Sequence, residues 1–330
     1  MIANHLKSFD NTEEAKFHVT SLPIGHTVNG EWMQAPNKRM LVREDTLDYV
    51  SVVNDTYHVI QNRELIDTIN DQLVGAFGTQ IFDGSLDSCQ TKVGISERGA
   101  ATFVYYDFPN ISTEIKTNTG HKTELKFRVI LKNTFDGSSK VRLYVGHIDS
   151  FCENGMIAGE YSVVSQSHRT ALKIKDFTKK FEESLDNYQE STTQYREMAQ
   201  RTVISSADVM RLFTRLTKKK KEVSMKERYE EEWIDYLNNN DKTKRKDTLA
   251  HKLYNRWWNV ELPERGDNVY SVMSTLTFYG SHNSEWFPLR KGKGDTANRQ
   301  TNTGLRLHKR NEQVTQWLQS DAWKQFARVA

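Results

Sequence analysis

Residues 126–155 read KFRVILKNTFDGSSKVRLYVGHIDSFCENG, and this stretch decides the fold. Apolar and polar residues alternate over Lys126–Leu131 and again over Lys140–Val145, which is the period of strands with one buried and one solvated face. Asp136-Gly137 lies between the two runs and predicts a turn, because Gly tolerates positive φ and Asp hydrogen-bonds the backbone ahead of it. We therefore expect an antiparallel hairpin with a basic outward face: Lys126, Arg128, Lys132, Lys140 and Arg142.

The composition is that of a folded chain. Its 330 residues are 37% hydrophobic and 27% charged, and 7 Trp, 13 Tyr and 15 Phe argue against disorder. Cys89 and Cys152 are the two cysteines, which excludes a disulfide scaffold and favours a reducing compartment. The N-terminus lacks the apolar core of a signal peptide, and no run approaches the roughly eighteen apolar residues of a membrane span. We expect a protein of the host cell cytoplasm without membrane contact.

Charge is divided unevenly between the two halves. The net charge is +3, but residues 1–160 hold 15 basic and 21 acidic side chains, whereas residues 161–330 hold 31 and 22. The second half is therefore the better candidate for contact with a polyanion. Because the surplus is modest, such binding should depend strongly on salt.

The first half has mostly strand patterns. Residues 1–37 are expected to be irregular, with Trp32 and Met33 covering an edge of the core. Asn62 is expected to cap a helix over Arg63–Phe77, whose apolar residues recur at helical spacing. Strands are predicted at Met40–Arg43, Tyr49–Val53, Tyr57–Gln61 (this last one a strand or an approach to the helix), Gln90–Ile95 and Ala101–Phe108.

The second half has the helical period. Phe181, Leu185, Tyr188, Tyr195 and Met198 form a nearly heptad stripe, which predicts helix-on-helix packing or a self-association seam. Further helices are predicted after Ser205, at Glu227–Leu237 and at Lys242–Arg256. A loop is predicted at Lys291–Gly304, before one final helix with Val314, Trp317, Leu318, Trp323 and Phe326 on one face.

The predicted fold class is α+β. Residues 1–155 form a mostly antiparallel β-rich domain with one packed helix, and residues 156–330 form a mainly helical region with a long helix and a basic C-terminal segment.

Several motifs resemble the DUF932 family of phage- and plasmid-encoded proteins. Tyr57–Asn62 is similar to its Y-x-V-V-Q-N motif, and Asn133–Ser138 to its N-x-x-D-G-S turn. Cys152–Gly155, His168 and Asn268–His282 resemble later motifs in the same order. The resemblance implies a mobile-element origin and an association with replication, recombination and counter-defence functions.

Enzymatic motifs are few. The sequence contains no P-loop, G-x-G-x-x-G, HExxH or CxxC pair, so we expect no cofactor and no metal. His147 and Asp149 share one face of a strand while Cys152 points to the other, which favours a structural role. His168 and His282 are candidate acid–base residues, with Asp149 or Glu153 as the carboxylate partner. A nuclease or other hydrolase built on these residues is one alternative.

Cations and aromatic rings together favour nucleic-acid binding. Proteins that bind single strands need cations along the phosphates and rings on which bases stack. Lys252 and Arg256 are neighbours on one helix face, and one of Trp257 and Trp258 is expected to be exposed. By architectural analogy alone, the layout of residues 50–150 also resembles ring-forming single-strand annealing proteins.

The leading hypothesis is a non-enzymatic DNA-binding protein of a phage or plasmid that prefers single-stranded DNA and supports replication or recombination. The stripe on the long helix makes homo-oligomerisation a subsidiary prediction. The rival hypothesis is a host-takeover or counter-defence protein that binds a host protein through its acidic first half or the Glu227–Leu237 helix. The predicted DNA contacts are Lys126, Arg128, Lys140, Arg142, Lys218, Lys219, Lys220, Lys221, Lys244, Arg245, Lys246, Arg256 and Trp257.

Overall fold

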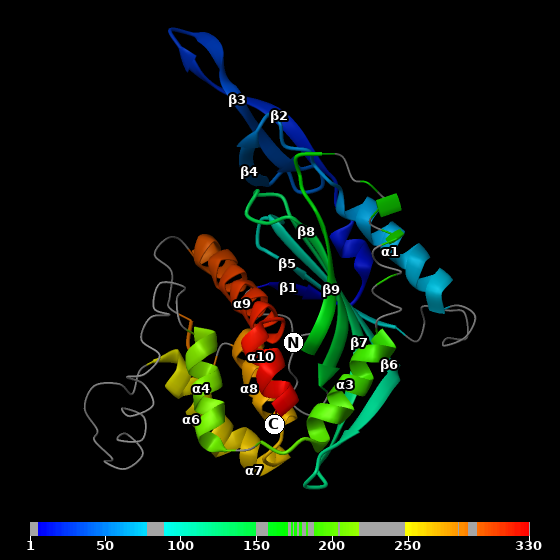
Figure 1. The fold of residues 1–330 in the computed structure, drawn as a ribbon. Helices are drawn as coiled ribbons and strands as arrows, with labels where there is room; N and C mark the ends of the chain where they lie inside the picture. The colour runs from blue at the N-terminus through cyan, green and yellow to red at the C-terminus, as the bar shows by residue number, and fades with distance from the viewer. Residues whose placement is uncertain are drawn as a thin grey trace.

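One large antiparallel sheet organises the protein (Figure 1). The computed structural model describes residues 6–77, 89–149, 158–170, 173, 175, 176, 178, 179, 183, 188–203, 205–217, 248–282, 284–289 and 296–329. The sheet has six strands in the order β1-β5-β6-β7-β8-β9, and every neighbouring pair is antiparallel. The α+β prediction is thus confirmed.

The strands of this sheet are long at its centre. Their bounds are β1 Lys7–Phe9, β5 Gln90–Ile95, β6 Ala101–Lys116, β7 Lys122–Thr134, β8 Val141–Asp149 and β9 Ala158–Gln166. The predicted hairpin is β7–β8, and Gly137 in its turn has φ +70 while Ser138 N–H donates to Asp136 Oδ1 at 2.9 Å. Because β9 pairs with β8, the sheet continues past the expected boundary at residue 155.

A smaller sheet extends from one end of the large one as an arm (Figure 1). It contains β2 (Val19–Val28), β3 (Glu31–Arg43) and β4 (Tyr49–Asn54). The expectation of irregular structure over residues 1–37 is therefore wrong, although Asn29-Gly30 does form the β2–β3 turn. Trp32 and Met33 are 55% and 53% exposed on this arm and do not cover the core.

One face of the large sheet packs on helix α1 (Asn62–Phe77). The predicted helical face is buried: Leu65, Ile66, Ile69 and Leu73 join Val93, Val104, Val129 and Leu131 in one hydrophobic cluster. Removal of this apolar surface from water is the main stabilising contribution on this side of the sheet.

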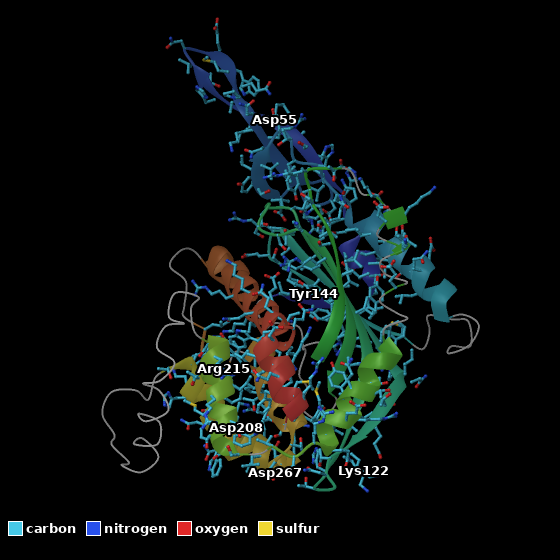
Figure 2. All side chains as sticks on the ribbon, in the orientation of Figure 1. Asp55, Lys122, Tyr144, Asp208, Arg215 and Asp267 are labelled. Atoms are coloured by element: carbon cyan, nitrogen blue, oxygen red, sulfur yellow. The ribbon has the colours of Figure 1, made fainter. Side chains whose placement is uncertain are left out.

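The opposite face of the β7–β8 hairpin is covered, contrary to the expectation of a solvated face. Arg128, Ile130, Lys132 and Tyr144 are all buried. An ion pair between Arg142 on β8 and Glu312 on α9 (Thr296–Leu318) connects this face to the helical half. Alternation of apolar and polar residues indicates that a strand has two different faces, but it does not indicate whether another element packs against the polar face. In Figure 2, Tyr144 lies near the middle of the molecule and Lys122 near the far end of the sheet.

The helical half has its own core around α8 (Val269–Ser281). The other elements are α3 Tyr188–Gln200, α4 Ser206–Thr217, α6 Leu249–Arg256, the π-helical turn η3 Trp257–Glu261, α7 Leu262–Arg265, α9 and α10 Asp321–Val329. Tyr195 of α3 is buried in this core, so the described part of the stripe makes intramolecular contacts. The predicted loop at 291–304 is partly wrong, because α9 begins at Thr296, and the final helix is two helices.

A buried amide network joins the β7–β8 turn to the start of α1. The side chain of Asn133 donates to Ile60 O at 2.9 Å and to Asn62 Oδ1 at 2.8 Å. Asn62 in turn donates to Ala15 O at 2.9 Å and to Thr102 Oγ1 of β6 at 3.1 Å. Its side chain therefore connects β6 and β7, and it does not cap the helix, contrary to the expectation. Both amides are fully buried, and buried polar groups are costly to leave without partners.

Replacement of Asn133 by Ala tests this network. The substitution leaves Ile60 O and Asn62 Oδ1 without their donor, and we expect the free energy of unfolding to fall by about 2–3 kcal/mol. Urea denaturation measures the change. Asn110→Ala on the exposed part of β6 is the control and should stay within about 0.5 kcal/mol of the wild type. Equal effects of the two substitutions would contradict the structural role of Asn133.

Candidate functional site

A cleft of about 570 Å³ opens beside the β7–β8 turn. Its walls come from β3, β4, the turn, β8, the segment after β9 and α9. The charged residues of the lining are mostly cations: six cations and two carboxylates, Asp136 and Glu312, line the cleft. The cations are Lys38, Lys132, Lys140, Arg142, Arg169 and Lys309.

Lys132 lies on the floor of this cleft. Its side chain is fully buried, and within the described residues its Nζ has no hydrogen-bond partner. The pKa of Lys132 is lowered to about 7, mainly by burial and then by the charge of Arg142, while Asp136 acts in the opposite direction. A buried amine without a carboxylate partner is an unusual and costly arrangement.

The other buried lysine and arginine side chains among the described residues are paired. Arg128 lies on the same face of β7 and forms a bidentate ion pair with Asp107, which is its register partner on β6. Arg256 and Arg265 both bind Glu261, at 2.9 and 2.8 Å. Lys132 thus differs from the paired arginines of the same fold, and this difference marks the cleft floor.

The rim cations are more accessible. Lys140, Arg169 and Lys309 are exposed, and Lys38 donates to Asn54 Oδ1 at 2.7 Å. Arg142 is half-buried and paired with Glu312, but no described group accepts from its Nε. The cleft therefore presents donors and an excess of positive charge, which is the chemistry that binds anions.

A rigid aromatic pair forms one wall. The rings of Tyr57 and His168 stack with centroids 4.7 Å apart, and Tyr57 Oη donates to Thr134 O at 2.9 Å. His168 Nδ1 lies 3.2 Å from His58 O, so this nitrogen carries the proton and donates to the carbonyl. Burial lowers the pKa of His168 and raises that of Tyr57, which favours the neutral form of both rings.

The predicted hairpin contacts are only partly brought together here. Lys140 and Arg142 line the cleft. Lys126 lies six residues before Lys132 on β7, a separation of about 20 Å along a strand, and pairs with Glu124 at 3.5 Å. Arg128 is buried and neutralised by Asp107, so its expected exposure is wrong.

The predicted contacts of the helical half lie elsewhere or outside the described residues. Arg256 is buried beside Glu261, with its guanidinium 3.2 Å from the centroid of the Phe278 ring. Trp257 is 2% exposed and donates to Ser271 Oγ at 2.9 Å, whereas Trp258 is 49% exposed. The accessible ring is therefore Trp258 and not the predicted Trp257. Lys218–Lys221 and Lys244–Lys246 lie outside the described residues.

The candidate acid–base histidines have separate surroundings. His147 is buried edge-on against Tyr195, His168 stacks on Tyr57, and His282 stacks on Phe278. Burial lowers the pKa of His147 to about 3, which keeps its ring neutral at physiological pH. In the described part of the chain, no group of three or more His, Cys, Asp or Glu residues is arranged to hold a metal ion. Hydrolysis by these residues stays a prediction.

Fold and site together define an α+β protein with a cationic cleft at one end of an antiparallel sheet. The chain belongs to the family described as "Domain of unknown function (DUF932)", whose model matches residues 49–313. A comparison with curated proteins found no match, and a comparison with solved structures found none either. Among the helices that the structure describes, none has the length and apolar character needed to cross a membrane.

Three of the motifs that carry the family resemblance meet around the cleft, whereas Asn268–His282 belongs to α8 and Cys152–Gly155 lies outside the described residues. Tyr57, Asp136 and His168 line it, and Asn133 and Asn62 anchor the turn behind it. The sequence patterns did not predict Lys38, Arg169 and Lys309 as site residues, and they predicted a solvated face for Lys132. The spacing of these four residues contains no local signal, because they come from β3, β7, the segment after β9 and α9.

Replacement of Lys132 by Met tests whether its amine is buried and unpaired. Between pH values of about 7 and 10.5 the folded chain loses the Lys132 proton while the unfolded chain keeps it, so the stability of the wild type rises with pH. We expect Lys132→Met to be the more stable protein at about pH 6.5, and its advantage to shrink by about 2 kcal/mol at about pH 9.

Chemical denaturation at the two pH values measures this difference. The matched control is Lys92→Met, which removes an exposed cation from β5 and should show no pH-dependent change relative to the wild type. An advantage of Lys132→Met that is the same at both pH values would show that Lys132 keeps its ordinary pKa in the folded state.

Proposed function

We propose that this protein is a non-enzymatic nucleic-acid-binding protein of a phage or plasmid, that it prefers single-stranded DNA, and that it supports replication or recombination in the host cytoplasm. The observation that supports the proposal is the cleft, which is lined by six cations and two carboxylates and whose floor lysine, Lys132, has no hydrogen-bond partner among the described residues. An excess of fixed positive charge in a concave site attracts phosphates, and it does so without base specificity.

Accessible aromatic rings add a second element of single-strand binding. Trp258 is half-exposed and stacks on Tyr254 with ring centroids 6.1 Å apart. Rings of this kind bind bases by stacking, which is worth about 1–3 kcal/mol per base. We retain Lys218–Lys221 and Lys244–Lys246 as predicted contacts of the same partner. Both segments lie outside the described residues.

Charge reversal on the cleft rim tests the proposal. The double substitution Lys140→Glu with Lys309→Glu should weaken binding of labelled single-stranded oligonucleotides by about ten-fold or more at low salt. It should also reduce the slope of log K against log salt by about 0.7 for each phosphate that the variant no longer neutralises. Fluorescence anisotropy over a salt series gives both quantities.

The control makes the same charge change away from the cleft. Lys92→Glu with Lys116→Glu reverses two exposed cations of β5 and β6 that do not line the cleft. If the control keeps the affinity of the wild type and the rim variant loses affinity, the result supports the cleft as the DNA-binding site. Equal losses of affinity in the two double variants, or no detectable binding by the wild type at low salt, would contradict the proposal.

One observation favours the rival function, binding to a host protein. The β2–β3 arm exposes large apolar side chains: Leu22, Val28, Trp32 and Met33. Exposed apolar groups on a projecting element are typical of protein interaction sites.

A nuclease-treated host lysate separates this rival from DNA binding. If the rival function holds, a specific host protein should be captured by the wild type and lost in Trp32→Ser with Met33→Ser. The control Val74→Ser changes an exposed apolar residue of α1 and should capture it as the wild type does. Capture that does not depend on Trp32 and Met33 would contradict a role for the arm.

A further inference from the structure

The floor of the cleft concentrates positive charge at one point. Lys132 on β7 and Arg142 on β8 are direct register partners, so two cations face each other across adjacent strands. Like charges in opposing positions destabilise a sheet. Lys309 of α9 adds a third cation, close enough to lower the pKa of Lys132. An anion bound between these three groups would relieve their repulsion.

The size of the cleft limits the ligand. About 570 Å³ is in the range of sites for single small molecules, which span roughly 300–1,000 Å³. Non-specific single-strand sites, in contrast, cover about 4–16 nucleotides for each binding fold. The cleft therefore fits one nucleotide-sized group better than a continuous run of strand.

The charge of the floor favours one kind of phosphate. At pH 7 a phosphate monoester carries a charge of about −1.5 to −2, whereas a phosphodiester within a strand carries one negative charge. The cations of the cleft outnumber its two carboxylates, Asp136 and Glu312, and such an excess of positive charge attracts the more highly charged monoester more strongly than a diester. The stacked rings of Tyr57 and His168 supply an apolar wall in the same cleft for the group that carries the phosphate.

We propose that Lys132 on the cleft floor, together with Arg142 and Lys309 on the adjacent rim, forms a binding site for a phosphate monoester, carried by the end of a nucleic-acid strand or by a free nucleotide. If the ligand is a strand end, this inference rests on the proposed function. If the ligand is a free nucleotide, the inference does not depend on the proposed function. The rim cations alone would bind any polyanion, and this site would make the protein prefer ligands with a terminal phosphate.

The bound anion should also change the protonation of the floor. Free Lys132 has a pKa of about 7, and a phosphate beside it favours the charged amine, so binding takes up a proton above that pH. The affinity for the monoester should therefore decrease by up to about ten-fold per pH unit above about pH 7. The charges that act on Lys132 are those of Arg142, Asp136 and Lys309. The other charged or titratable groups that line the same cleft are Lys38, Tyr57, Lys140, His168, Arg169 and Glu312.

The test compares ligands that differ only in the terminal phosphate. The full chain is titrated with a short oligothymidylate bearing either a 5′-phosphate or a 5′-hydroxyl, and with thymidine 5′-monophosphate against thymidine, at fixed salt. The wild type should bind at least one phosphorylated member about ten-fold tighter than its unphosphorylated counterpart. Tight binding of the nucleotide identifies a nucleotide site, and preference confined to the oligonucleotide identifies a strand end.

Two variants link this preference to the floor. Lys132→Met should abolish the preference for the phosphate, and the control Lys92→Met should keep it. Because Lys132 is buried, the exposed Lys309→Ala provides a second test that does not disturb the core, and it should reduce the preference several-fold.

The outcomes separate the inference from the proposed function. Equal affinity for phosphorylated and unphosphorylated ligands overturns the monoester site, and salt-dependent strand binding would then still support the proposed function. A preference that survives in both Lys132→Met and Lys309→Ala also overturns it. Nucleotide binding without any strand binding would support the site and contradict the proposed function.

Discussion

The feature on which the cleft depends is a buried lysine that no carboxylate neutralises in the described structure. Lys132 extends from the central strand β7, opposite Arg142 on β8, and its fully buried side chain lies among the residues that line the cleft. The same fold pairs Arg128 with Asp107 and both Arg256 and Arg265 with Glu261. Burial of Lys132 without an ion pair among the described residues lowers the stability of the fold, and unfavourable arrangements of this kind cluster at functional sites.

The rest of the site is arranged to keep this lysine in place. The amide network of Asn133 and Asn62 fixes the turn against α1, and Tyr57 connects the same turn to His168. Asp136 accepts from the backbone of Ser138 and so shapes the rim. These residues belong to three of the DUF932 motifs, which are separated in the chain but meet within one region of the structure. The motifs therefore describe a scaffold, and the cations around it supply the binding chemistry.

Local patterns predicted the parts of the fold that local physics determines. The β7–β8 hairpin, its Asp136-Gly137 turn and the buried face of α1 follow from alternation, turn chemistry and helical spacing. The covered outer face of the hairpin does not follow, because the docking of α9 depends on contacts between distant segments. The β2–β3 arm was missed because its residues have weak apolar alternation and include Pro23 and Pro36. Trp257 and Trp258 are adjacent, and only the packing around α8 decides which of them is buried.

The most direct test of the cationic floor is the titration of Lys132 itself. The side-chain resonance of Lys132 in protein carrying isotope-labelled lysine is assigned through its absence in Lys132→Met and followed over pH by NMR. We expect a pKa of about 7 in the free protein and a higher pKa when a phosphate-bearing ligand is bound. A resonance that titrates near the ordinary lysine value of about 10.4, with or without ligand, would show that Lys132 is solvated or paired and would contradict an unneutralised floor.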